Sequence, residues 1–380
     1  MKKILMGTTA LVAAGAVAGI APAQAADPIQ ITVGGYMEQW FGFGDNEDTA
    51  GDIQNTNVIS DTEIFFTGRT TLDNGITFGV NVQLEGNSNA ADQIDESFLF
   101  IQGGFGRILF GSENSAGYLM QTAPPDVGIG FNSGDQTNWI ANNTGSGLFR
   151  SAFGSVNVEP GAVNDSEKLT YFTPRFAGLQ FGVSYLPGGG QDNAQETQSG
   201  AFHDGVTTGL NYTQDFGGFN VAASATFGYM SAGNTAVNAN AALDDSAMHY
   251  TVGANLGVGP ISGGVAFVHH FQADNSATAS REGYGINGGV AYQNGPIGVS
   301  ANVHYGRAEG RVADPEDDTH LSAGLSGSYT LGPGIQLRST IGWAQFDGEA
   351  ADTINGGNAT GVADATNSGV FAVAGFRLTF

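Results

Sequence analysis

Apolar and polar residues alternate along most of the chain. The alternation is clearest at 78–85, 179–185, 219–229 and 297–305, where every second residue is Ala, Val, Leu, Ile, Phe or Tyr. A period of two places these side chains on one face of a β-strand and mostly Gly, Ser, Thr, Asn and Gln on the other. Outside residues 1–25, no convincing helical spacing of apolar residues recurs. The pattern therefore predicts an all-β protein.

Two kinds of connection alternate between the expected strands. Short connections rich in Gly, Asn, Asp and Pro favour tight hairpin turns; they lie at 73–75, 103–104, 215–218, 257–260, 294–296 and 332–334. Longer polar connections lie at 44–58, 187–202, 231–245, 273–280, 310–318 and 348–367. Counting through the chain gives about 16 strands, and an even number with short turns at one end and long loops at the other is typical of outer-membrane proteins. We therefore expect a transmembrane antiparallel up-and-down β-barrel.

Several features favour a barrel in lipid over a soluble sandwich, which also shows alternation. The expected strands run for about ten residues or more, enough for a tilted membrane crossing. No segment after residue 25 approaches about 18 consecutive apolar residues, which excludes helical spans. Aromatic residues gather near strand ends, where membrane barrels carry interfacial girdles; they are Trp40, Phe41, Phe43, Phe267, Phe271, Trp343 and Phe346.

The last segment, 369–380, has the pattern of a final barrel strand. Phe376, Leu378 and Phe380 share one face, and Arg377 lies on the other. We expect the apolar face to contact lipid and Arg377 to face the lumen. The first expected strand begins at Ile29, so both ends of the chain can pair and close the barrel, as lipid requires of every backbone group.

The N-terminus has the layout of a secretory signal peptide. Lys2 and Lys3 precede an apolar run, and Ala23-Gln24-Ala25 follows as a small-residue cleavage pattern. The run is short and weakly apolar for a membrane anchor. We therefore expect residues 1–25 to be removed and residues 26–380 to form a single transmembrane barrel domain.

The composition of the remaining chain is acidic but rich in aromatic residues. Two of the 12 basic residues precede residue 26 and all 36 acidic residues follow it, so the mature charge is 10 minus 36, or −26. This argues against nucleic acid as a partner, and the 25 Phe argue against a disordered acidic chain. Cysteine is absent, and the 60 glycines are scattered through strand-like segments, which fits the bends of a curved sheet.

Residues 113–166 break the alternation. Connections this long are uncommon unless they are functional. The segment contains Pro124-Pro125, several acidic residues and many Gly, Ser and Asn. It is either an outer decoration or a loop that folds into the barrel and constricts the pore.

Three segments resemble the general, non-specific porins of Gram-negative bacteria, of the alphaproteobacterial type. They are 104–112 before the long segment, 168–185 after it, and the terminal Phe380. The resemblance covers the whole mature chain. It implies a 16-stranded trimeric barrel with an inward-folded third loop, exported through the periplasm to the cell outer membrane. There it would contact lipid and lipopolysaccharide and form a water-filled channel for passive diffusion of ions and small hydrophilic solutes.

The resemblance also implies a constriction where acids on the inward loop face basic residues on the wall. By strand parity the inward basic candidates are Arg69, Arg107, Lys168, Arg338 and Arg377. On the loop we expect the acidic side to comprise Glu113, Asp126 and Asp135. Porins of this family often carry Arg in place of Lys168, and many use their second loop, here the short segment 86–92, to latch onto a neighbouring subunit.

The excess of acidic residues predicts a modest preference for cations, because charge sign in a narrow mouth of low dielectric sets selectivity. Clustered oxygens in the outer loops are weak candidates for Ca²⁺ or Mg²⁺; they are Asp45, Glu47, Asp48, Asp317 and Asp318. No EF-hand spacing occurs, so solvated loop charges remain the favoured interpretation. No other cofactor is expected.

No enzyme motif is evident. A Gly-x-Ser-x-Gly elbow, an HExxH pair, a phosphate loop and a dinucleotide fingerprint are all missing from the sequence. The adjacent His269 and His270 point to opposite faces of a strand. We expect no enzyme activity, and two alternatives to a general porin remain: a substrate-selective channel, and a surface-binding scaffold or adhesin. An inward third loop indicates a sieve, whereas an outward one favours a binding role.

Overall fold

The computed structural model describes residues 27–47, 53–86, 93–142, 144, 151–160, 163–190, 202–232, 246–272, 282–309, 316–348 and 366–380. Within these ranges, sixteen antiparallel strands form one closed barrel in which consecutive strands pair and the last strand pairs with the first. The strands are β1 Gln30–Asn46, β2 Thr56–Thr71, β3 Thr77–Glu85, β4 Ile94–Gly103, β5 Gly106–Ser112, β6 Glu167–Phe172, β7 Leu179–Gly188, β8 Phe202–Asp215, β9 Asn220–Ala232, β10 Ala247–Val258, β11 Ile261–Gln272, β12 Glu282–Asn294, β13 Ile297–Ala308, β14 Asp318–Gly332, β15 Ile335–Asp347 and β16 Asn367–Thr379.

The predicted all-β barrel and its closure are confirmed. β16 runs antiparallel to β1 from Tyr36 opposite Thr379 to Asn46 opposite Gly369. The terminal Phe380 extends this ladder, because its N–H donates to the carbonyl of Gly35 at 3.1 Å and its carbonyl accepts from the Gly35 N–H at 3.0 Å. The expected signal peptide lies outside the described residues. Among the described residues, no helix is long and apolar enough to cross a membrane.

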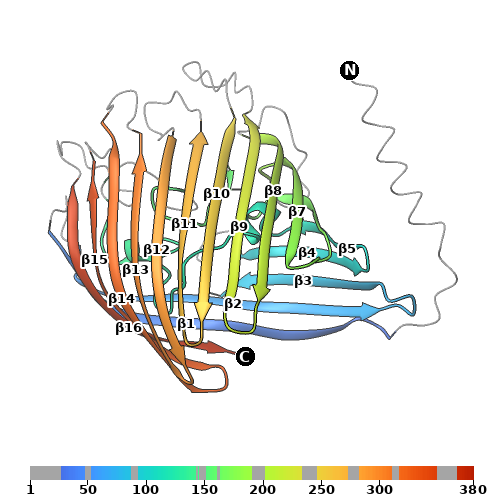
Figure 1. Ribbon diagram of the computed structural model, residues 1–380, viewed down its shortest axis with the longest axis horizontal. Helices are drawn as coiled ribbons and strands as arrows, with labels where there is room; N and C mark the ends of the chain where they lie inside the picture. The colour runs from blue at the N-terminus through green and yellow to red at the C-terminus, as the bar shows by residue number, and fades with distance from the viewer. Residues whose placement is uncertain are drawn as a thin grey trace.

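Short turns gather at one end of the barrel. Figure 1 shows the hairpins that join β8 to β9 and β10 to β11 at the bottom, and the C-terminus lies toward the same end. Gly75, Gly217, Gly259, Gly295 and Gly334 adopt positive φ in these turns, a conformation that glycine reaches without steric cost. In outer-membrane barrels the short turns face the periplasm.

The outer face of the barrel is apolar. On β16, Phe376 and Leu378 are exposed, whereas Phe371 and Val373, on the opposite face, are buried inside the barrel. Across β10–β13, ring centroids 6.1, 6.2 and 6.0 Å apart join a row of aromatic side chains: Tyr250, Phe267, Tyr284 and Tyr305. An apolar band bordered by aromatic rings suits the interface between lipid and water.

Two aromatic residues expected in the girdle face the interior instead. Trp40 on β1 is 7% exposed and Phe346 on β15 is fully buried, and both pack against loop residues Phe131, Trp139 and Phe153. The girdle expectation was therefore wrong for Trp40 and Phe346. Position near a strand end does not reveal which face a loop will cover, and here the covered face is the inner one.

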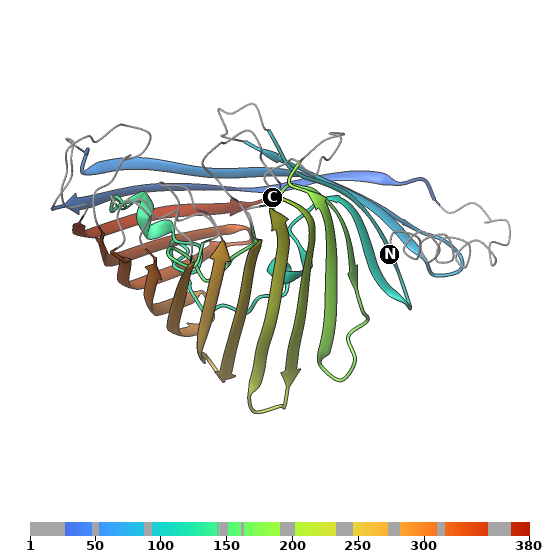
Figure 2. The ribbon, with the colours of Figure 1, turned by 90° about the horizontal axis from the view of Figure 1, so that it is seen from above.

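The long segment after β5 lies inside the barrel, as expected for a sieve. Figures 1 and 2 show this teal-to-green segment within the curve of the strands. It contains the short helices α2 Ala116–Leu119 and η1 Asp135–Asn138. Its apolar side chains pack on the inner wall in three buried clusters, which include Phe131 with Phe371, Val158 with Val268, and Val163 with Leu186. The barrel therefore buries its apolar side chains between this loop and one side of the wall.

Several glycines of the strands are explained by the loop. A Cβ at Gly253 on β10 would overlap the carbonyl oxygen of Thr122, and a Cβ at Gly306 on β13 would overlap that of Phe153. The loop backbone therefore lies directly against the backbone of the wall. Sequence alone had suggested bends and bulges for such glycines, but at these two positions close approach of the loop requires them.

Candidate pore constriction

Small polar side chains of the inner wall hold the loop backbone in place. At the start of the loop, the N–H groups of Ala116, Gly117 and Thr122 donate to hydroxyls of β7, β8 and β9 at 2.8, 3.1 and 2.8 Å. Further along, wall asparagines donate to loop carbonyls: Asn255 to Ala123, Asn302 to Pro125 and Asn367 to Ala141. Much of the polar lumen face predicted from the alternation is therefore occupied by the loop.

Histidines of the inner wall also contact the loop, a role that sequence reasoning missed. His304 on β13 and His320 on β14 are both fully buried, with a ring nitrogen 3.2 and 3.1 Å from the Phe153 carbonyl oxygen. Nδ1 of His270 accepts from the Ala152 N–H at 3.1 Å. His269 lies on the outer face and pairs with Glu282 at 2.6 Å. The expected opposite orientation of His269 and His270 is confirmed.

Lys168 lies on the inner face of β6, as strand parity predicts, but the base of the loop covers it. The residue is only 5% exposed. Its ammonium donates to the carbonyls of Asn164 and Ser166, both at 2.7 Å, and to that of Glu113. These bonds join the beginning of the loop to its end. Lys168 is therefore covered by the loop and not exposed at the pore, although its charge still acts on the neighbouring Glu113 carboxyl.

Asp126 shapes the loop from within. Its carboxylate accepts from the backbone N–H groups of Gly128, Gly130 and Phe131 at 2.9, 3.0 and 2.7 Å. Three such bonds are typical of a structural carboxylate that fixes a tight turn. The Ser300 hydroxyl lies 3.5 Å from the same carboxylate, so the turn rests against β13.

The other two expected loop acids are partly withdrawn from water. Burial raises the pKa of Glu113, although bonds from Asn114 and the nearby charges of Lys168 and Arg107 oppose the shift. Burial also raises the pKa of Asp135 to about 8, with the charges of Asp61 and Glu38 on the wall acting in the same direction. Glu113 is therefore close to basic side chains, whereas Asp135 is close to acidic side chains of the wall.

An acidic wall on β1–β4 was missed by sequence reasoning. Glu38, Asp61 and Glu63 share the inner face with Trp40, because Glu38 pairs with Asp61 and Tyr36 pairs with Glu63. Glu85 lies opposite Glu63 on β3. Together with two acids of β4, the wall carries Glu38, Asp61, Glu63, Glu85, Asp95 and Glu96. Strand parity with Arg69 predicts Asp61 and Glu63 on this face, so a signal existed for them.

The four wall arginines lie toward the short-turn end. Arg69 is near the end of β2, Arg107 near the start of β5, and Arg338 and Arg377 near the turn-side ends of β15 and β16. Arg377 and Arg338 both reach Glu38, the latter at 3.2 Å. The Arg107 guanidinium stacks 4.4 Å above the Phe100 ring. The charge is therefore layered along the pore axis, with arginines near the turns and carboxylates nearer the loops.

Open cavities adjoin this wall. One of about 540 Å³ is lined by residues including Gln30, Arg69, Asn81 and Arg107. A second of about 530 Å³ also reaches Arg107 and extends to Arg175. Both lie at the turn end of the lumen, beside the strands of the acidic wall.

The outer-loop acids expected as weak ion ligands do not come together. Asp317 forms an ion pair with Arg307, Glu47 accepts from the Ser368 hydroxyl at 2.6 Å, and Asp318 is buried. Asp48 lies outside the described residues. Among the described residues, the one group of three potential metal ligands contains neither these residues nor Asp45.

Comparisons with known proteins agree with the barrel. The sequence profile of a family described as Gram-negative porin matches residues 7–349. No curated protein sequence matches the chain. An anion-selective porin from Comamonas acidovorans is similar at 15% identity and a TM-score of 0.61, with 93% of this chain and 100% of that chain covered.

Two further solved structures have the same fold. OmpT, an outer membrane protein of Vibrio cholerae in a trimer form, is 11% identical with a TM-score of 0.59, covering 93% of this chain and all 100% of its own. A triple mutant of the Rhodopseudomonas blastica porin is 16% identical with a TM-score of 0.53, covering 92% of this chain and 100% of its own. At such identities the likeness establishes the fold alone.

Proposed function

We propose that this chain, which belongs to the Gram-negative porin family, forms an outer-membrane channel that passes ions and small hydrophilic solutes by passive diffusion through a water-filled lumen. One observation carries this proposal. The long loop is bonded along the inner wall from β7 to β16, so it narrows the lumen from one side and leaves the acidic wall of β1–β4 facing the passage. We propose no enzymatic role.

We propose that the constriction lies between the loop and the wall of β1–β5. The wall side comprises the acids described above and four arginines: Arg69, Arg107, Arg338 and Arg377. Glu113 and Asp135 form the loop side, and Asp126 holds the loop in shape. A solute would pass carboxylates near the loop and then arginines near the turns, so a charged solute would meet two regions of opposite charge in succession.

We propose a modest preference for cations. Six carboxylates line the wall of β1–β4, and two of the four arginines are paired with Glu38. The net field of this wall is negative, which raises the local concentration of cations in a narrow, low-dielectric mouth. We also propose a homotrimer with its apolar outer face in contact with lipid and lipopolysaccharide; a trimer form occurs among the similar structures.

Planar-bilayer recording tests this function. Refolded protein should give ohmic steps that close in three substeps, and a salt gradient should give a reversal potential of cation-selective sign. Replacing Asp61→Asn and Glu63→Gln together should move that potential toward zero. Replacing Asp73→Asn and Asp215→Asn, which lie at exposed turns, should leave it in place. Protein that inserts folded but passes no current would refute the channel, and an anion-selective potential would refute the cation preference.

A further inference from the structure

A cavity of about 530 Å³ lies at the turn end of the lumen, beside the short helix α2 of the inward loop. Its walls come from the turns after β4 and β6, from β7 and β8, and from the end of α2. Two arginines line it, Arg107 and Arg175, but no Asp or Glu does. The whole chain carries 36 acidic residues against 12 basic ones. The charge of this cavity is therefore opposite in sign to that of the chain.

The Arg107 guanidinium lacks a polar partner. Its Nε is buried with no hydrogen-bond acceptor in reach, and Arg107 forms no ion pair within the described part of the chain. The Phe100 ring covers one face of the guanidinium. Glu113 acts on it electrostatically, but the backbone and side chain of Asn114 donate to that carboxylate. A buried nitrogen without an acceptor is costly, and an anion in the cavity would supply the acceptor.

Arg175 is held in place without being neutralised. Its guanidinium donates to the carbonyl of Gly178 at 2.7 Å and to the side-chain oxygens of Gln180 and Asn211 at 2.9 and 2.7 Å. All three acceptors are uncharged, and a guanidinium has more N–H donors than these bonds use. The side chain is therefore ordered before a ligand arrives, so an anion would lose little affinity to the ordering of Arg175.

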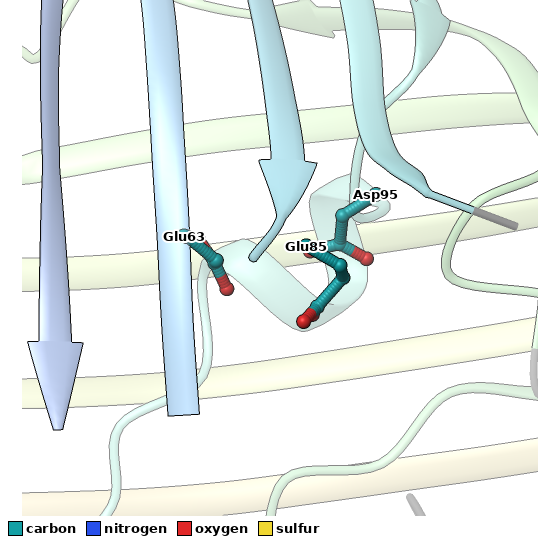
Figure 3. Close-up of side chains that lie close together, drawn as sticks. All are labelled: Glu63, Glu85 and Asp95. Carbon is teal, nitrogen blue, oxygen red and sulfur yellow. The ribbon is translucent and has the colours of Figure 1, made fainter. Parts of the chain in front are cut away.

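The carboxylates of the wall lie elsewhere. Figure 3 shows Glu63, Glu85 and Asp95 together on β2–β4, with oxygens within 4.8 Å of one another. None of the three lines the cavity. Glu85 ends β3 on the loop side, whereas Arg107 lies next to the turn at the start of β5. This acidic group therefore leaves the charge of the cavity uncompensated.

Apolar side chains complete the lining of the cavity. Leu119, the last residue of α2, is 44% exposed although it lies inside the barrel. Met120 packs beside Phe172, because a Cβ at Gly182 would lie 2.6 Å from Sδ of Met120 and 2.7 Å from the Phe172 ring. All three apolar side chains line the cavity. An apolar group placed against them would lose contact with water, which favours binding.

We propose that this cavity binds a small monocarboxylate with an apolar body, such as an aromatic acid. The carboxylate would bind at Arg107 and Arg175, because the planar guanidinium matches the geometry of a carboxylate. The apolar body would lie against Leu119 and Phe172. A volume of about 530 Å³ is within the range of small-molecule sites. A fully polar anion would leave the apolar lining without a partner, and an amine would meet charge of its own sign.

The site has a consequence for the channel, and that consequence rests on the proposed function, whereas the binding itself does not. A bound carboxylate would occupy part of the passage at the turn end and neutralise the arginines there. The current should therefore fall, and the remaining acidic wall should make the channel more selective for cations. Transport of such acids would saturate instead of rising in proportion to concentration.

Isothermal titration calorimetry of the full-length barrel in non-ionic detergent tests the site with benzoate. We expect one saturable site per chain at millimolar benzoate, and at least tenfold weaker binding of acetate and of benzylammonium. Arg107→Gln should weaken benzoate binding at least tenfold, and Leu119→Asn should reduce it to the level of acetate. Arg307→Gln is the matched control, because Arg307 pairs with Asp317 away from the cavity, and it should bind benzoate like the wild type.

Several outcomes would overturn the site. They are no saturable heat at millimolar benzoate, unchanged binding by Arg107→Gln, or equal affinity for acetate and benzoate. Leu119 is exposed, so Leu119→Asn should fold even if Arg107→Gln does not, and heat-modifiable gel mobility checks both variants.

A planar bilayer gives a second readout. Benzoate should lower the single-channel current of the wild type but not that of Arg107→Gln. Calorimetry needs no conduction, so a barrel that binds benzoate but passes no current would uphold the site and refute the channel. A conducting barrel that binds no benzoate would refute the site and uphold the channel.

Discussion

Replacing Asp126→Ala should release the middle of the inward loop. The Asp126 carboxylate accepts three backbone N–H groups, from Gly128, Gly130 and Phe131, at 2.7–3.0 Å. Alanine offers no acceptor, and Phe131 is fully buried against the wall. The three donors would lose their partner in a place where water reaches them poorly, so the local turn would open more often.

The size of the effect follows from these bonds. Hydrogen bonds to a charged group contribute about 1.5–3 kcal/mol each, which gives an upper limit of about 9 kcal/mol for three. Contributions within one network are not additive, and opening lets the donors reach water. We therefore expect about 3 kcal/mol, which corresponds to about a hundredfold increase in the population of the locally open loop.

Hydrogen exchange of the folded barrel measures this opening. The amides of Gly128, Gly130 and Phe131 should exchange about a hundredfold faster in Asp126→Ala, because exchange reports local opening. Asp126→Asn, which keeps one oxygen, should show a smaller increase. Asp73→Asn, at an exposed turn, should show none. Unchanged exchange in Asp126→Ala would refute the structural role. Asp126 would then act as a simple pore charge, and its replacement should change the reversal potential more than it changes hydrogen exchange.

Three further predictions concern the loop and its wall. Lys168 is the only lysine after residue 25, and because it is buried, an amine-reactive ester should label it only after heat unfolding; rapid labelling of the folded barrel would contradict its placement. The pKa of Asp135 is raised to about 8 by burial, so the folded loop binds a proton that the unfolded chain loses near pH 4. The stability of the docked loop should therefore fall as pH rises from about 4 to 8 and stay constant above pH 8. Hydrogen-exchange protection factors of the loop amides should show this decrease in the wild type but not in Asp135→Asn. A decrease that persists in Asp135→Asn would refute the role of Asp135. Gly253→Ala should push the loop at Thr122 into the lumen and lower single-channel conductance, whereas Gly288→Ala, where a Cβ meets nothing within 4 Å, should not; equal conductance in both would contradict the close approach.

The barrel could be predicted from the sequence because its signals are local. A period of two and the turn residues between strands fix the faces and connections without knowledge of the rest of the chain. Parity also places Arg69, Arg107, Arg338 and Arg377 inside. Strand parity does not place Asp95 correctly, because a β-bulge in β4 adds one residue that the alternation of apolar and polar residues does not show.

The loop could not be predicted in the same way. Irregular backbone has no period, so neither the three N–H bonds of Asp126 nor the burial of Lys168 has a local signature. The inward faces of Trp40 and Phe346 depend on a loop distant in sequence, since nothing near either residue in the chain indicates that the inner wall is covered there. The acids of the wall share their strand parity with arginine, as Asp61 and Glu63 do with Arg69, so parity places them inside without showing which charge dominates the wall.

The anchoring of the loop has a consequence for the order of assembly. The loop's partners include Asn255, His270 and Asn367, which lie far along the chain, so the loop cannot dock until late strands have arrived. Contacts of such long sequence separation form slowly because loop-closure entropy must first be overcome. A newly closed barrel would therefore pass through a stage with an undocked loop and a wider opening. At that stage the apolar inner patch around Phe346 and Phe371 would be exposed to water. Maturation of this protein would then appear as a decrease in current that follows insertion.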